Sequence, residues 1–262
     1  MGDVGVFDLL NPLFYWVDQF LQAQFGFAKV LRMGVFAGFG SAASMWLFKI
    51  FSNQNQLAEL KLKISNVQKE LTKTDGNTSD LKHNIQLNLQ LTGKQLWLSL
   101  WPALLACLPV LFLLSFSSHQ YGALTPDAGF RVYVTPVGYQ SSPSDFEWQG
   151  VNAQWDARKK AWTFYQPEPG STARLMLFDQ QQFIFPVDTP ADVVHKKRWW
   201  NFLFANPAGY LDDQASVELF ELNAPQQIVI NWGPGWMRGW LFAFLLYLIV
   251  FSVAIKIIFK IH

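Results

Sequence analysis

The sequence contains little charge and almost no cysteine. Of its 262 residues, 15% are Asp, Glu, Lys or Arg and 51% are hydrophobic, whereas ordinary soluble domains are about 25% charged. The single cysteine, Cys107, excludes an internal disulfide and lies in an apolar run, where a buried hydrophobe is more common than a reactive thiol. The net charge of +1 gives no global attraction to nucleic acid. This composition predicts a membrane protein.

The sequence also lacks the motifs of common catalytic and metal sites. Its four histidines have no metal-ligand spacing, and neither a glycine-rich phosphate loop nor a GxSxG motif occurs. Adjacent carboxylates such as Asp212 and Asp213 are typical of solvated turns. The first 28 residues contain three Asp and no Lys or Arg, the reverse of a cleavable signal peptide. We expect no enzymatic activity, no metal and no cofactor.

Three segments are apolar and long enough to cross a bilayer, which needs about 20 helical residues. They are residues 27–51, residues 95–117, and residues 239–262, which include a short tail. In the first segment, Gly34 and Gly38 form a small-xxx-small stripe that favours close helix packing. In the second, Pro102 and Pro109 predict a bent helix in a bundle, because each proline leaves a backbone carbonyl without its usual donor.

Residues 1–26 are predicted to form an amphipathic helix. Apolar side chains recur at three- and four-residue intervals, and Asp8 and Asp18 fall largely elsewhere on the helix. Such a helix lies either at the membrane interface or on the surface of the protein itself, and the pattern does not decide between the two. The apolar positions are Phe7, Leu10, Phe14, Val17 and Leu21.

Residues 52–94 are predicted to form a coiled-coil hairpin. The first arm has a seam that includes Leu57, Leu60 and Ile64, and the second arm carries Leu81, Ile85 and Leu89. This segment has six lysines against four acidic side chains, and loops rich in lysine stay in the cytoplasm. Three crossings then place the N-terminus outside and the C-terminus in the cytoplasm.

Residues 118–238 are predicted to form an extracytoplasmic β domain, sandwich-like or barrel-like. Short apolar runs, among them 130–137, 162–166 and 227–232, alternate with turn residues. One basic run leads into two tryptophans, and contact with lipid headgroups is favoured over nucleic acid on this side of the membrane. An ordinary solvated loop is an equally weighted alternative. The headgroup candidates are Lys196, Lys197, Arg198, Trp199 and Trp200.

The sequence therefore predicts an integral membrane core of three helices with a cytoplasmic coiled-coil hairpin and an inserted extracytoplasmic all-β domain. In this order of elements it resembles the YidC/Oxa superfamily of membrane insertases, most of all the branch of small archaeal YidC-like proteins and the insertase subunit of the ER membrane protein complex. The resemblance is carried by residues 11–13 (NPL), 55–61, 67–71, 101–104, 108–112 and 239–252.

The resemblance implies an insertase or biogenesis factor whose helices enclose a hydrophilic groove for client membrane proteins. An alternative is a non-insertase structural subunit that anchors the β domain, which would dock a partner. Expected partners are lipids, nascent or client membrane proteins and other complex subunits, but not nucleic acid. The lack of disulfides and usable glycosylation sites favours the bacterial inner membrane. Candidate groove residues are Arg32, Ser41, Ser44, Lys49, Ser99 and Ser115.

Overall fold

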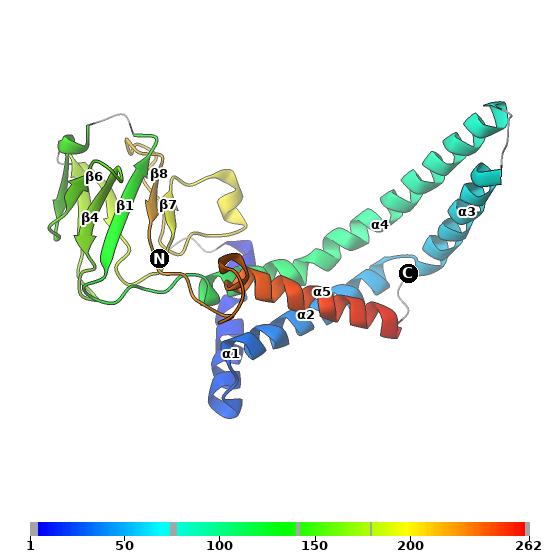
Figure 1. Cartoon of the computed structure of the whole chain (residues 1–262), viewed down its shortest axis with the longest axis horizontal. Helices are drawn as coiled ribbons and strands as arrows, with labels where there is room; N and C mark the ends of the chain where they lie inside the picture. The colour runs from blue at the N-terminus through cyan, green and yellow to red at the C-terminus, as the bar shows by residue number, and fades with distance from the viewer. Residues whose placement is uncertain (1–4, 74–77, 140–141, 179, 260–262) are drawn as a thin grey trace. The chain divides into compact units, whose positions relative to one another are not determined.

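The computed structural model describes residues 5–73, 78–139, 142–178 and 180–259. The chain divides into two compact units (Figure 1). The β unit comprises Met1–Gly26 and Ser115–Phe242, and the helical unit comprises Phe27–Leu114 and Ala243–His262. Long helices and a separate antiparallel β region are thus both present, as the sequence predicts. The N-terminal segment belongs to the β unit.

The structure has three helices that are long and apolar enough to cross a membrane, within Lys29–Phe51 (α2), Leu81–Tyr121 and Trp240–Phe259 (α5). The second is part of α4, which runs without a break over Thr78–Tyr121. No helix break therefore marks the expected boundary between hairpin and span at residue 95. Pro102 and Pro109 both lie inside α4, which continues through them.

The glycines of α2 lie against aromatic side chains of α5. A Cβ atom on Gly34 would be 3.4 Å from the Tyr247 ring, and one on Gly38 would be 3.4 Å from the Phe251 ring. Larger side chains at these two positions would separate the helices, as in other small-xxx-small contacts. The stripe therefore sets how closely α2 and α5 approach within the helical unit.

Helix α3 (Gln54–Lys73) and helix α4 run in opposite directions from residues 74–77 (Figure 1). One face of α3 buries Leu57, Leu60, Ile64 and Val67, which match the predicted seam. On the exposed face of α3, Lys63 lies 2.6 Å from Glu59 and lowers the pKa of that carboxyl by hydrogen bonding. The second arm is helical and forms the first part of α4, and its apolar residues are exposed: Leu81, Ile85 and Leu89.

The β unit contains two antiparallel sheets. One has the strand order β3-β4-β1-β8-β7 and the other β2-β5-β6. Strand β1 is central because it pairs with both β4 and β8, and its alternating burial shows that one of its faces is packed. Its pairing with β4 ends at Val134, before Pro136, which has no N–H to donate. The strands are β1 (Arg131–Val137), β2 (Phe146–Gln149), β3 (Gln154–Asp156), β4 (Ala161–Tyr165), β5 (Ala173–Leu177), β6 (Gln180–Phe185), β7 (Val193–His195) and β8 (Leu219–Leu222).

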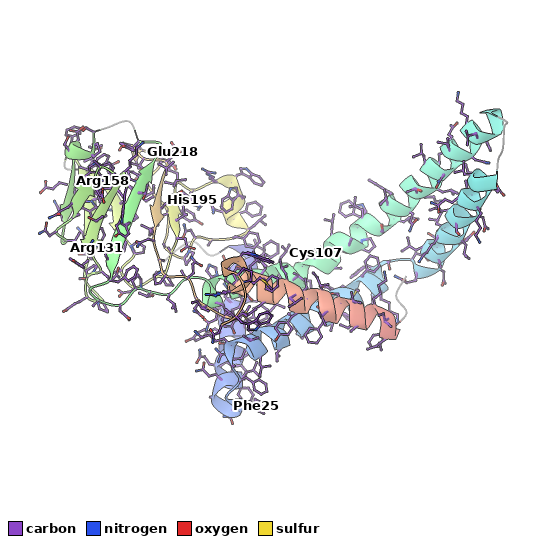
Figure 2. All side chains as sticks on the ribbon, in the orientation of Figure 1. Phe25, Cys107, Arg131, Arg158, His195 and Glu218 are labelled. Carbon is purple, nitrogen blue, oxygen red and sulfur yellow. The ribbon has the colours of Figure 1, made fainter. Side chains whose placement is uncertain are left out.

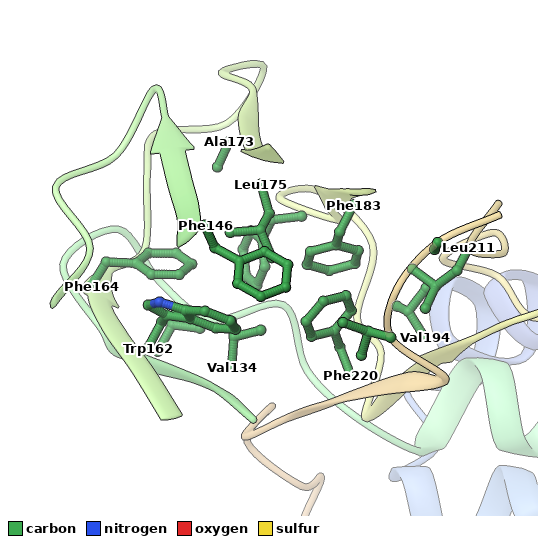
Figure 3. Close-up of a cluster of buried hydrophobic side chains, with 14 of the residues drawn as sticks. Val134, Phe146, Trp162, Phe164, Ala173, Leu175, Phe183, Val194, Leu211 and Phe220 are labelled. Carbon is green, nitrogen blue, oxygen red and sulfur yellow. The ribbon is translucent and has the colours of Figure 1, made fainter. Parts of the chain in front are cut away.

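Aromatic side chains from both sheets form one core (Figure 3). Phe183 of β6 stacks on Phe220 of β8 with ring centroids 4.6 Å apart. Phe146 of β2 meets Trp162 of β4 edge to face at 5.3 Å. Contacts of this kind add to the apolar area that each ring buries. The sheets therefore pack face to face, in a sandwich-like arrangement.

The expected strand at residues 227–232 does not form. The N–H groups of Val229 and Ile230 both donate to the carbonyl of Arg238, at 2.9 and 3.2 Å, so the segment closes a local loop instead of joining a sheet. Three short strands, β2, β3 and β7, were not predicted, because strands of three or four residues are too short to show an alternating pattern.

We predict that Phe220→Ala destabilises the β unit by about 3–5 kcal/mol, because it opens a cavity beneath the Phe183 ring. The test is denaturant unfolding of the full chain in detergent, followed by tryptophan fluorescence. Phe178→Ala is the matched control, since Phe178 is 77% exposed, and should change stability by less than about 0.5 kcal/mol. Equal midpoints for the two variants would contradict the core described above.

Candidate functional site

Helix α2 carries three candidate groove side chains with different environments. Ser41 is fully buried and donates a hydrogen bond to the carbonyl of Leu248 at 3.2 Å, so it contributes to the contact with α5. The hydroxyl of Ser44 is also buried, but it has no hydrogen-bond partner among the described residues. Lys49 is exposed in the last turn of α2.

The other candidate groove residues already form hydrogen bonds with groups of the protein itself. Arg32 is buried, and its guanidinium donates to the carbonyl of Phe27 at 3.2 Å, just before the start of α2. Ser99 donates to Leu96 of its own helix at 3.0 Å, and Ser115 belongs to the β unit. Ser44 is thus the candidate hydroxyl whose hydrogen-bonding capacity remains open. Cys107 is exposed on α4 (Figure 2), whereas the sequence analysis expected it to be buried.

Asp8 is the centre of a buried polar cluster that sequence reasoning missed. It ends the short helix η1 (Val6–Asp8), and its carboxylate accepts hydrogen bonds from the N–H groups of Gly5 (3.1 Å) and Ala205 (2.7 Å). Ser115 of α4 donates its hydroxyl, and the amide of Asn11 donates at 3.3 Å. The carboxylate thus joins the N-terminal segment, the end of α4 and the 203–205 loop.

The ring of His119 lies beside the same cluster. Its Nδ1 atom is 3.7 Å from Asp8 and 3.0 Å from the amide nitrogen of Asn11. The polar groups here therefore come from η1, from the first residue of helix α1 (Asn11–Phe25) and from the last turns of α4. A buried carboxylate needs this number of donors, because an unpaired charge away from water is costly.

Asp18, in the middle of α1, is the centre of a second buried polar site. It is 0% exposed, and it accepts hydrogen bonds from the Tyr121 hydroxyl and from the side-chain amide of Gln120 at 3.2 Å. The prediction that Asp8 and Asp18 lie on a polar face is therefore wrong. The sequence did contain a signal for the burial of Asp18. Asp18 follows Phe14 by four residues and therefore lies on the same face of the helix. Phe14 is indeed buried and packs on Phe116 of α4.

The side of α1 turned away from this contact is also apolar. Leu13, Trp16 and Phe20 are exposed, Trp16 by 64%. They repeat at intervals of three and four residues and form a second stripe on the helix, which we call the outer stripe. Most of the stripe predicted from the sequence packs on the protein: Phe7 and Phe14 are buried, and Val17 and Leu21 are half-buried. Leu10, which was predicted to belong to the same stripe, is exposed.

The basic run lies at the short helix η3 (Trp199–Phe202) of the β unit. Lys196 pairs with Glu218 at 3.4 Å, whereas Lys197 and Arg198 are exposed. His195 lies near the Trp200 ring at 5.5 Å; Figure 2 shows His195 and Glu218 in this part of the β unit. Trp199 is 81% exposed, so η3 presents an aromatic ring to the surroundings next to the exposed side chains of Lys197 and Arg198. The Nζ atom of Lys197 also lies 5.8 Å from the centroid of the Tyr210 ring.

The open face of the five-stranded sheet carries a second group of cations and phenols. Lys159 lies 3.7 Å above the ring of Tyr133, and Arg131 donates to the Tyr165 hydroxyl at 3.2 Å. Hydrogen bonding to Lys159 lowers the pKa of Tyr133, and hydrogen bonding to Tyr165 raises the pKa of Arg131. Sequence spacing alone could not reveal this group, because strand register brings it together.

The fold and these sites define a chain with three candidate membrane spans and an antiparallel β unit attached to its N-terminal helix. No protein-family model matches the sequence, no curated protein matches it, and no solved structure matches the fold. Within residues 5–259, apart from the three gaps in the description at 74–77, 140–141 and 179, no group of histidine, cysteine and acidic side chains could hold a metal ion.

We predict that Asp8→Ala loosens the N-terminal segment, because it leaves the N–H groups of Gly5 and Ala205 and the Ser115 hydroxyl without an acceptor. The opening free energy of α1 should fall by about 3 kcal/mol. Hydrogen exchange of the α1 amides, measured by mass spectrometry on the full chain in detergent, tests this. The exposed Asp213→Ala is the control, and unchanged exchange in Asp8→Ala would show that the cluster does not hold α1.

Proposed function

We propose that this chain is a membrane protein insertase or biogenesis factor of the YidC/Oxa type, with its helical unit in the bilayer. Three apolar helices and a polar helical arm in the expected order support the proposal. The observation that carries it is the hydroxyl of Ser44, which is buried in an apolar helix and has no partner among the described residues. In this proposal, polar groups of a client segment supply that partner.

The energetic benefit of such a site follows from the properties of the bilayer. A charged side chain at the centre of a membrane helix costs about 2.5–3.5 kcal/mol on insertion scales. A hydroxyl with unused hydrogen-bonding capacity lowers the cost for polar groups that pass beside it. Lys49, exposed one turn beyond Ser44, extends the polar path toward the end of α2.

The proposed membrane is the bacterial inner membrane. The lysine excess of residues 52–94 supports a cytoplasmic position for α3 and the first turns of α4. The N-terminus and the β unit then lie outside, and the C-terminus lies in the cytoplasm. In this orientation the helical arm would meet client chains as they leave the ribosome.

The alternative is a structural subunit whose helices anchor the β unit within a larger complex. The Asp8 cluster favours it, because the carboxylate binds the 203–205 loop to the end of a candidate span. In this reading the β unit or the helical arm docks another subunit, and no client passes along α2.

Photocrosslinking from a probe at Ser44 separates the two functions. If the chain is an insertase, we expect adducts with many newly made membrane proteins at Ser44, and only lipid adducts at Ile249. Ile249 is the control because it is exposed on α5. A single stable adduct at Ser44 would favour the structural subunit, and lipid alone at both positions would contradict the insertase.

A substitution pair provides the functional test. We predict that Ser44→Leu lowers integration of client proteins by about tenfold, since about 1.4 kcal/mol of lost stabilisation has that effect. Ala42→Leu adds bulk at an exposed position of the same helix and should leave integration unchanged. A pulse-chase assay of client integration in cells, at matched levels of each variant, decides the question. Equal integration in the two variants would contradict the role of Ser44.

A further inference from the structure

Exposed aromatic side chains occur in several segments of the β unit, and three of these segments lie beside the Asp8 cluster or a candidate span. The outer stripe of α1 contains Trp16 and Phe20, and η3 carries Trp199 and Phe202. Trp236, in the short helix η4 (Gly235–Met237), is also exposed and lies four residues before the first residue of α5. A water-soluble surface rarely exposes this many large aromatic rings without a binding role.

Two of these segments are held together by the Asp8 cluster. Leu203, which directly follows η3, accepts a hydrogen bond from the N–H of Phe7 at 2.9 Å, and the Phe7 and Phe204 rings are 4.9 Å apart. The first turn of α1 follows within a few residues (Figure 1). The orientation of η3 is therefore fixed relative to α1.

Helix α1 and Trp236 each lie next to the end of a candidate membrane span. Helix α1 packs on the last turns of α4 through Phe116 and Tyr121, and only residues 26–28 separate it from α2. Trp236 contacts Phe242 in the first turn of α5, with ring centroids 5.3 Å apart. Span ends lie at the membrane–water boundary, where tryptophan and tyrosine are enriched.

We propose that the outer stripe, η3 and Trp236 form one lipid-binding surface that seats the β unit on the outer face of the bilayer. The inference rests on the membrane location in the proposed function, but not on client insertion. Interfacial helices usually carry lysine or arginine on their polar face, and α1 has neither. Lys197 and Arg198 beside η3 supply the cations, so anionic headgroups are the ligands of this surface.

Within the β unit, the residues beside η3 therefore contribute the electrostatic part of binding and α1 contributes the apolar part. Because the Asp8 cluster fixes both, η3 cannot rotate away from the bilayer while α1 remains in it. The surface is distinct from Ser44, which belongs to the helical unit.

The test uses single-cysteine variants of the full chain in a Cys107→Ser background, since Cys107 is the one native cysteine. An environment-sensitive fluorophore is attached at position 20 of the outer stripe or position 202 of η3. The chain is reconstituted in nanodiscs of phosphatidylcholine with or without phosphatidylglycerol, and quenching by brominated lipid is measured. Position 249 on α5 is the positive control, and position 178, an exposed hairpin tip, is the negative control.

We expect quenching at positions 20, 202 and 249, and none at 178. Phosphatidylglycerol should increase quenching at 202, and Lys197→Gln with Arg198→Gln should reduce it by at least about twofold without changing position 249. Quenching at 20 but not at 202 would overturn the shared surface and leave α1 alone in the interface.

A blue-shifted but unquenched probe at 202 would overturn the proposal in favour of a protein occupant, such as a second copy of the chain. Loss of quenching at 249 would instead show that the membrane location itself is wrong. None of these outcomes depends on adducts at Ser44, so failure of the insertase proposal remains separate.

Discussion

The carboxylate of Asp8 determines how the β unit is assembled. Four donors from separate parts of the chain converge on it: Gly5, Asn11, Ser115 and Ala205. A buried carboxylate is tolerated only when it accepts enough hydrogen bonds. Each of the four donors in turn finds its acceptor in the Asp8 carboxylate. The arrangement is therefore mutually dependent, and the N-terminal segment, the end of α4 and the 203–205 loop hold their positions together.

The sequence was sufficient for the features that depend on length and hydropathy. Three apolar helices follow from runs of about 20 residues, and β1 follows from its strict alternation. It was insufficient for α1, because that helix has two apolar faces. A periodicity argument identifies a stripe but does not say which stripe meets the protein, so the burial of Asp18 beside Phe14 went unrecognised. The prediction of a strand at 227–232 was wrong for a similar reason. The hydrogen bonds from this segment to the carbonyl of Arg238 close a loop, and such a loop has no periodic pattern in the sequence.

The candidate groove residues show why polar binding sites in apolar helices are hard to predict from the spacing of residues in the sequence. A serine in a helix readily donates to a carbonyl of its own or a packed helix, as Ser99 does to Leu96 and Ser41 to Leu248. Such hydroxyls already have an acceptor within the protein. Ser44 differs from Ser41 and Ser99 because its hydroxyl has no carbonyl acceptor among the described residues. The positions of such acceptors on neighbouring helices are known only from the tertiary structure.

In the proposed arrangement, apolar and electrostatic contributions to membrane binding are assigned to different parts of the β unit. The outer stripe of α1 has no cations, whereas Lys197 and Arg198 directly precede η3, which is only a short aromatic segment. Either part alone would be a weak and mobile anchor, because a short apolar surface or a few charges gives only reversible binding. Rigid linkage through Asp8 makes both bind at once, which raises the effective concentration of each part at the bilayer surface. The buried carboxylate thus supports folding of the β unit and the avidity of its proposed membrane contact by the same set of hydrogen bonds.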